Sequence, residues 1–265
     1  MQTQTTESSA RLLNAVAIVT GGASGIGHGI ALEFAREGAA VAILDLNRVG
    51  AEGTVQEIQK EGGKAVAVTA DVTDSGQVEA AVRSAAAQLG EASVLVNCAG
   101  FNQLAPANEL PAGLWEKIRA INLDGPWYCA NAVMPAMIRR RAGKILNIAS
   151  GVAILAAPNS APYCAAKAGL IGLTRALALD LAPYGINVNC VCPGSVNTPL
   201  VQQAMSPAFL QKLVEITPFA RLATPRDIAQ ATVFLCSSDA NYITGVVLPV
   251  DGGLTCGMRW PTQTE

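Results

Sequence analysis

Short apolar segments alternate regularly with segments of helical periodicity along this chain, and this alternation constrains the fold most. Segments that are apolar on both faces are typical of strands inside a parallel sheet that helices cover on both sides. Seven such segments span residues 15–20, 41–44, 65–69, 94–97, 144–149, 186–191 and 246–250. Helical patterns lie between them, near residues 26–37, 49–60, 77–89, 114–140, 162–181 and 226–235. The alternation predicts an α/β protein with a doubly wound sheet of about seven parallel strands.

Length and composition favour a single large domain. The chain has 265 residues, of which 51% are hydrophobic and 14% charged. The charged share is well below the usual roughly 25%, so we expect extensive burial in the core or between subunits. Residues 1–12 are polar and lack the basic start and apolar stretch of a signal peptide. We predict a disordered leader over residues 1–12, followed by one domain over residues 13–265.

Several classes of protein do not fit this composition. A net charge of −2 gives no electrostatic footprint for nucleic acid. No apolar run reaches the roughly 18 residues that a membrane-spanning helix needs. The single histidine, His28, excludes a His-rich metal site and leaves little room for a Ser-His-Asp hydrolase. None of the seven cysteines forms a C-x-x-C pair, so we expect no metal site, and reduced thiols in a cytoplasmic protein.

A proline-rich segment interrupts the alternation in the second half of the chain. Residues 198–227 show no strand pattern and contain four prolines. A long insertion at the carboxyl edge of such a sheet is often a lid over the ligand crevice. We therefore predict a substrate lid near residues 198–227.

The first strand runs into a glycine-rich turn and then a helix. The turn reads Thr20-Gly21-Gly22-Ala23-Ser24-Gly25-Ile26-Gly27. Glycines let a backbone turn tightly and approach a pyrophosphate, and the N–H groups that open the helix favour that anion. A glycine turn can also serve geometry alone, so its context decides the interpretation.

Asp45 ends the second strand and supplies that context. An acidic residue at this place can bind the ribose hydroxyls of an adenosine, and its charge would repel a 2′-phosphate. NAD is therefore preferred to NADP as the cofactor. Arg48 lies close in sequence and would partly offset the repulsion, and Asp45 could instead cap the following helix.

A tyrosine and a lysine share one face of the helix after the fifth strand. Tyr163 and Lys167 are four residues apart, and Ser150 ends the preceding strand. A free phenol has a pKa of about 10 and is a poor base at neutral pH. A nearby ammonium lowers that pKa, so the pair makes a workable general acid/base for an alcohol or carbonyl, with a serine hydroxyl to hold the substrate oxygen.

Together these motifs resemble the short-chain dehydrogenase/reductase family. The resemblance runs over residues 14–253 and includes the T-G-x-x-x-G-I-G turn, Asp71, an N-x-A-G segment and Pro193-Gly194. It implies a Rossmann-like fold and hydride transfer between NAD and a secondary alcohol or its ketone. The catalytic tetrad it implies is Asn122, Ser150, Tyr163 and Lys167.

The resemblance also implies roles for these residues. Tyr163 would be the general acid/base, Ser150 would fix the substrate oxygen, and Lys167 would bind the nicotinamide ribose and acidify Tyr163. Asn122 would hold a water that links Lys167 to solvent, or it could simply kink its helix. The cofactor-binding residues implied are Gly21, Ser24, Gly25, Ile26, Gly27, Asp45, Leu46, Asp71, Val72, Asn97, Ala99, Gly100, Tyr163, Lys167, Pro193, Gly194, Val196 and Thr198.

The chain departs from the family pattern at two positions. Cys98 stands where most members have a second asparagine, which removes a polar anchor near the fourth strand while Asn97 remains. Pro162 directly precedes Tyr163; proline is tolerated in a first helical turn, so we interpret it as part of the pocket wall.

The expected substrate pocket is mostly apolar, with a few amides. Its wall would comprise Val152, Ile154, Leu155, Leu200, Met205 and Phe209, with Asn102, Gln103 and Asn159 nearby. No cluster of cations lines it, so a small free anion is disfavoured and a non-bulky or cyclic secondary alcohol or its ketone fits better. These apolar residues could also be ordinary core.

Other functions stay open at this point. A 3-oxoacyl carrier-protein reductase docks an acidic carrier through basic residues; Tyr184 stands at one such position and Arg141 at the other. A hydroxyacyl-coenzyme A dehydrogenase is a further alternative. A non-catalytic nucleotide-binding regulator would be expected to have lost Tyr163 or Lys167, and both are present.

We also expect a homotetramer. The helix over residues 162–181 is rich in alanine and glycine, and small residues let helices of neighbouring subunits approach closely. Low surface charge suits a buried face between subunits, and the resembled family is usually tetrameric. The final segment, 254–265, with Trp260, could reach a neighbouring subunit.

Overall fold

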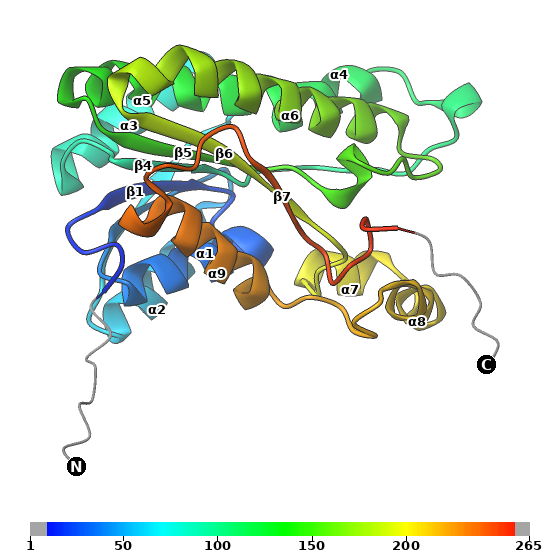
Figure 1. The fold of residues 1–265 in the computed structure, drawn as a ribbon. Coiled ribbons are helices and arrows are strands. Elements are labelled where there is room, and N and C mark those ends of the chain that lie inside the picture. The colour runs from blue at the N-terminus through cyan, green and yellow to red at the C-terminus, as the bar shows by residue number, and fades with distance from the viewer. Residues whose placement is uncertain (1–9, 258–265) are drawn as a thin grey trace.

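A seven-stranded parallel sheet forms the centre of the computed structural model, which describes residues 10–257 (Figure 1). Its strand order is β3-β2-β1-β4-β5-β6-β7. The strands are β1 (Val16–Thr20), β2 (Ala40–Asp45), β3 (Lys64–Thr69), β4 (Val94–Asn97), β5 (Gly143–Ile148), β6 (Ile186–Pro193) and β7 (Val247–Val250). Every neighbouring pair is parallel. The predicted doubly wound α/β sheet is confirmed.

Helices cover both faces of the sheet (Figure 1). The helices are α1 (Gly25–Arg36), α2 (Arg48–Lys60), α3 (Ser75–Leu89), α4 (Leu114–Arg119), α5 (Gly125–Arg140), α6 (Ala161–Leu181), α7 (Pro199–Ala204), α8 (Pro207–Ile216) and α9 (Pro225–Cys236). Helices α1, α2 and α9 lie on one face, and α3 to α6 lie on the other. None of the helices within residues 10–257 is both long and apolar enough to cross a membrane.

The two apolar faces of each central strand explain the two helical layers. In β1, Ala17 and Val19 pack into the core beneath α1 and α9, whereas Ile18 packs into the core beneath α3 and α5. Successive side chains of a strand point to opposite faces of the sheet. A strand without a polar face is therefore stable only with helices on both sides.

The strand order reverses next to β1. The chain moves from β1 through β2 to β3 on one side and then crosses to β4 on the other side of β1. In open α/β sheets ligands bind outside the carboxyl ends of the strands at such a switch point. The glycine turn after β1 and the residues 98–100 after β4 both lie there.

The structure divides the single helix that we expected over residues 114–140. A π-helical turn over Ala120–Asp124 separates α4 from α5. Asn122 lies inside this turn, and its side-chain Nδ2 donates to the carbonyl of Ile118 at 2.9 Å. π-helical turns often occur at functional sites.

The segment predicted as a lid contains two helices that the sequence reading missed. Pro199 and Pro207 each occupy the first turn of a helix, where a missing N–H costs little. Thr198 caps α7 and Ser206 caps α8, each through its side-chain hydroxyl. The prolines start helices here instead of marking a loop.

The domain begins earlier than the predicted leader allows. Arg11 donates from its backbone N (2.9 Å) and its Nε (3.0 Å) to Glu37 at the end of α1, and Leu12 is buried. Residues 11 and 12 thus belong to the folded domain because they pack on α1. The rest of the leader, 1–9, and the final residues 258–265 with Trp260 lie outside the described residues.

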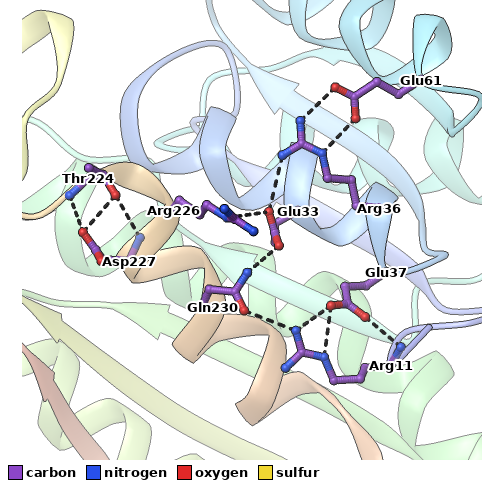
Figure 2. A network of polar contacts seen from close by, with 9 residues as sticks. All are labelled: Arg11, Glu33, Arg36, Glu37, Glu61, Thr224, Arg226, Asp227 and Gln230. Atoms are coloured by element: carbon purple, nitrogen blue, oxygen red, sulfur yellow. Dashed lines mark hydrogen bonds and ion pairs between the residues drawn. The ribbon is translucent and has the colours of Figure 1, made fainter. Parts of the chain in front are cut away.

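A network of charged and amide side chains joins α1 to α9 (Figure 2). Glu33 is buried, accepts a hydrogen bond from Gln230 of α9 and pairs with Arg36 Nη1 at 3.4 Å. Arg226 Nε lies 3.7 Å from the same carboxylate. The network fixes the helix that follows the glycine turn against the helix that follows the segment 198–227.

Candidate active site

Close packing in the glycine turn explains two of its glycines. Gly21 has φ +69°, and a Cβ on it would lie 2.8 Å from the Cα of Ala99. A Cβ on Gly27 would lie 2.2 Å from the carbonyl oxygen of Gly21. Side chains at these positions would push the turn away from β4 and from α1, so the tight turn requires both glycines.

The N-terminus of α1 is available to an anion. Ser24, its capping residue, is exposed and makes no side-chain capping hydrogen bond, and the first turn holds no acidic residue. Free N–H groups and the helix dipole at such an end favour a phosphate. Gly25 and Ile26, predicted as cofactor contacts, lie in this first turn and are partly exposed.

Thr20 connects the turn to the end of β4, a role that the sequence reading missed. Its buried Oγ1 accepts hydrogen bonds from the backbone N of Cys98 and of Ala99, each at 3.0 Å. The only sequence signal is its place before Gly21. This contact holds the two carboxyl strand ends together at the switch point.

The carboxylate of Asp45 points toward the glycine turn. Its Oδ2 accepts from Ala23 N at 3.0 Å, and its Oδ1 accepts from Asn47 N at 2.8 Å. An ionised carboxylate has about four acceptor positions, so both oxygens can still accept a hydroxyl. The cap of the following helix is Asn47, whose side chain accepts from Gly50 N. The alternative that Asp45 itself caps α2 is therefore wrong. Leu46 beside it is exposed.

The side chains of three other predicted cofactor residues make contacts within the protein. Asp71 Oδ1 accepts from Thr73 N at 2.8 Å and from Thr73 Oγ1 at 2.7 Å, and Val72 is buried against Gly125. Asn97 points into the interior, where its Nδ2 donates to Asn147 Oδ1 at 2.8 Å. The Asn97 side chain is buried, so its predicted contact with a cofactor would use the backbone.

Ser150, Tyr163 and Lys167 meet at the carboxyl end of β5. The hydroxyl of Ser150 lowers the pKa of Tyr163 and so opposes the effect of burial on the phenol. Lys167 Nζ lies 5.7 Å from the centroid of the Tyr163 ring and donates to the carbonyl oxygen of Ile148 at 2.7 Å. The structure thus brings the predicted acid/base, its lysine and the serine together.

Burial sets the proton affinities of this group. It raises the pKa of Tyr163 to about 12, against the opposing hydrogen bond from Ser150. It lowers the pKa of Lys167 to about 8. The lowered tyrosine pKa that we expected is not found, because burial outweighs the effect of the Ser150 hydroxyl.

Asn122 connects the π-helical turn to the segment after β4. Its Nδ2 donates to the carbonyl oxygen of Phe101 at 2.7 Å as well as to that of Ile118. A Cβ on Gly100 would lie 3.1 Å from Asn122 Oδ1 and 3.8 Å from Lys167 Nζ. Gly100, a predicted cofactor contact, therefore lies directly beside the side chains of Asn122 and Lys167.

The segment after β6 closes the other side of the site. Val196 is buried and Thr198 nearly so, and a Cβ on Gly25 would lie 3.4 Å from Thr198 Cγ2. Gly194 packs against Asp251. The start of the segment 198–227 thus contacts the glycine turn, as a cover for a nucleotide would.

Comparisons with known proteins agree with this geometry. A family model described as Enoyl-(Acyl carrier protein) reductase matches residues 21–255. The chain is 38% identical to 2-(S)-hydroxypropyl-CoM dehydrogenase 3 of Xanthobacter autotrophicus, over 92% of this chain and 98% of that one. It is 40% identical to D-threitol dehydrogenase of Mycolicibacterium smegmatis, over 92% and 94%. The crystal structure of gox2181 has a TM-score of 0.91 at 36% identity, over 94% and 98%.

The chain belongs to the short-chain dehydrogenase/reductase family. Its relatives named here are dehydrogenases that act on CH–OH groups, and this short-chain dehydrogenase/reductase is an oxidoreductase. Members of the family use a nicotinamide nucleotide. The uncapped N-terminus of α1, with no acidic residue in its first turn, suits the phosphates of such a group.

Proposed function

We propose that this dehydrogenase interconverts an uncharged secondary alcohol and its ketone, with NAD as the hydride acceptor or donor. The observation that carries the proposal is the meeting of Ser150, Tyr163 and Lys167 beside the backbone of Gly100. Tyr163 would move the hydroxyl proton, and Ser150 would hold the substrate oxygen. When bound, the nicotinamide supplies the site for the hydride.

Residues at the switch point would hold the cofactor. The N–H groups that open α1 would bind the pyrophosphate. The carboxylate of Asp45 would accept the ribose hydroxyls, and Lys167 would donate to the nicotinamide ribose. Val196 and Thr198 would contact the carboxamide. Asn122 would hold a water between Lys167 and solvent. Each of these roles fits the place of the residue at the carboxyl edge of the sheet.

Charge near Asp45 supports NAD over NADP. Arg48, the nearby cation, pairs with Glu52 at 2.7 Å and so is engaged on the surface of α2. Ser24 stands in the turn where a basic residue could bind a 2′-phosphate. Asp45 forms no ion pair within residues 10–257, so its charge would oppose a 2′-phosphate bound beside it.

Exposed apolar side chains support an apolar substrate body. Large apolar residues are exposed on segments after β4, β5 and β6, whose carboxyl ends share one edge of the sheet: Leu104, Ile154, Leu155, Phe209, Ile216 and Phe219. Residues 151–160 contain no charged side chain. Apolar clefts with few polar groups are typical of small-molecule sites. Residues 198–227 would close over these side chains as a lid.

The carrier-protein alternative has less support. Arg139 and Arg140 both pair with Glu91, and Arg141 donates to the carbonyl of Pro183 at 2.7 Å. Arg141, the residue at one carrier-docking position, thus donates within the protein at the end of α5. Tyr184 at the other position supplies no charge for an acidic carrier.

A tetramer is part of the proposal. Trp127 on α5 and Leu179 on α6 are exposed, and α6 carries small residues along its length. Apolar side chains of this size on neighbouring helices suit a buried contact between subunits. Light scattering at micromolar protein would show about four times the 27.3 kDa chain mass, and a monomer would contradict it.

All seven cysteines are free in the described residues, which suits the predicted cytoplasmic location.

A substrate screen tests the proposed function directly. The purified protein would be given NAD and a panel of secondary alcohols that includes cyclic, linear, polyol and thioester-linked members, while the absorbance of NADH is followed. The proposal expects turnover of uncharged alcohols above that of coenzyme A or carrier thioesters. Turnover of the thioesters alone would instead support the alternative.

A further inference from the structure

The chain folds into a tight turn directly after β7. Gly252 has φ +63° and Gly253 has φ +90°, which only glycine adopts readily. The carboxylate of Asp251 accepts from Gly253 N at 2.9 Å, from Thr255 N at 2.8 Å and from Thr255 Oγ1 at 2.6 Å. We call residues 251–255 the Asp251–Thr255 clasp, because one buried carboxylate closes the whole turn.

One side of the clasp packs on the segments that carry the catalytic serine and the cofactor contacts. A Cβ on Gly151, the residue after Ser150, would lie 3.5 Å from Thr255 Cγ2. A Cβ on Gly194 would lie 2.9 Å from the Cα of Asp251. The methyl group of Thr255 and the backbone of Asp251 therefore touch both segments.

The other side of the clasp holds the end of α8. Phe219 N donates to the carbonyl oxygen of Gly252 at 3.2 Å. A Cβ on Gly252 would lie 3.0 Å from Thr217 Cγ2, and one on Gly253 would lie 3.2 Å from Pro218 Cγ. The turn lies beside α7 and α8 in Figure 1, where it is drawn in red. Within the described part of the chain, the bond from Phe219 is the hydrogen bond that joins residues 206–220 to the body of the domain.

Charge strengthens the closure of the turn. Burial alone would raise the pKa of Asp251, but hydrogen bonds from Thr255 and Gly253 outweigh it and hold the pKa below its usual value. The carboxylate is therefore ionised at neutral pH. A hydroxyl that donates to an ionised acceptor forms a stronger bond than one between neutral groups.

We propose that the Asp251–Thr255 clasp is a positioning element that fixes residues 206–220 relative to Ser150 and so sets the affinity for the alcohol. The proposal rests on the proposed function, because it assumes that these residues cover the substrate. Asp251 packs on Gly194, a predicted cofactor contact, whereas Thr255 packs on Gly151. Loss of the Thr255 hydroxyl should therefore weaken the binding of the alcohol while the binding of NAD is kept.

Two substitutions at one position test the clasp. Thr255→Val keeps the branched shape and removes the hydroxyl, whereas Thr255→Ser keeps the hydroxyl. For Thr255→Val we expect the KM of the best alcohol to rise about tenfold, the scale of a lost hydrogen bond to a charged group. The Kd for NAD should change less than about twofold on the same scale. Thr255→Ser should restore most of the alcohol affinity.

A control at the far edge of the sheet separates positioning from general stability. Ser237 also caps a turn, by accepting from Asp239 N at 3.2 Å, and it follows Cys236 beside the starts of β4 and β5. Ser237→Ala should leave the alcohol KM unchanged. An equal rise of the alcohol KM in Ser237→Ala, or no rise of that KM in Thr255→Val, would overturn the positioning role proposed for the clasp.

A second measurement keeps the two proposals distinguishable. Hydrogen exchange of residues 206–220 should be faster in Thr255→Val than in wild type, without any substrate. If wild type oxidises no secondary alcohol, the proposed function fails while exchange still reports on the clasp. Unchanged exchange in an active wild-type background would overturn the clasp alone.

Discussion

Lys167 Nζ lies 5.7 Å from the ring centroid of Tyr163, one helical turn away, and donates to a backbone carbonyl rather than to the phenol. Lys167 is buried and Tyr163 is partly buried, and desolvation makes each favour its neutral form. The protein alone therefore holds a neutral phenol beside an amine that gives up its proton near pH 8.

Burial of Lys167 should appear in the pH dependence of stability. Its pKa is about 8 in the folded protein and 10.5 as a free side chain. Between these values the unfolded chain binds more protons, so the free energy of unfolding rises with pH in this window. In urea denaturation, the free energy of unfolding of wild type should rise by about 1 to 2 kcal/mol more than that of Lys167→Met between pH 7.5 and pH 9.5.

The comparison with Lys167→Met removes the contribution of other groups. Burial also raises the pKa values of Cys98, Cys129 and Cys236 to about 12, and these lower stability above about pH 9 in both proteins. The difference between the two proteins isolates Lys167. Parallel pH profiles would show that Lys167 is not desolvated in the folded protein.

The two roles of Asp45 can be separated by substitution. Asp45→Asn removes the charge but keeps an acceptor for Ala23 N, so the glycine turn should stay in place. We expect the ratio of kcat/KM for NAD over NADP to fall about tenfold, because repulsion of the 2′-phosphate is lost. Asp45→Ala also removes the acceptor and should raise the KM of both cofactors. An unchanged ratio in Asp45→Asn would show that the carboxylate does not select the cofactor.

The network between α1 and α9 should contribute measurably to stability. Glu33→Gln removes a buried charge that Arg36, Arg226 and Gln230 share (Figure 2). We expect the free energy of unfolding to fall by about 1 to 3 kcal/mol. The exposed pair of Arg48 and Glu52 is the control, and Glu52→Gln should cost less than about 0.5 kcal/mol. Equal shifts of the urea midpoint would show that the network adds nothing beyond a surface pair.

The sequence predicts the sheet well because strands without a polar face, such as β4, are stable only inside a parallel sheet. It predicts α7 and α8 poorly, because Pro199 and Pro207 suggest a loop although proline also suits a first helical turn. Likewise, the π-helical turn at Asn122 depends on a tertiary bond to Phe101, which no periodicity reveals.

The candidate site, too, has features that the sequence predicts and features that only the folded structure shows. Tyr163, Lys167 and Ser150 can be placed together from spacing and strand ends, and the structure brings them together. Their proton affinities depend on burial, which spacing does not give. The inward direction of Asn97 follows from its bond to Asn147 across two strands. Only packed coordinates show such a pair.

The proton transfer assigned to Tyr163 is the central claim, and Tyr163→Phe tests it most directly. The substitution keeps the ring and removes the group that carries the proton. With the best alcohol and NAD, we expect kcat to fall by about 10²-fold or more across the pH range, the usual scale of general acid–base catalysis. The Kd for NAD, measured by calorimetry, should stay close to that of wild type. Wild-type turnover in Tyr163→Phe at every pH would contradict the account.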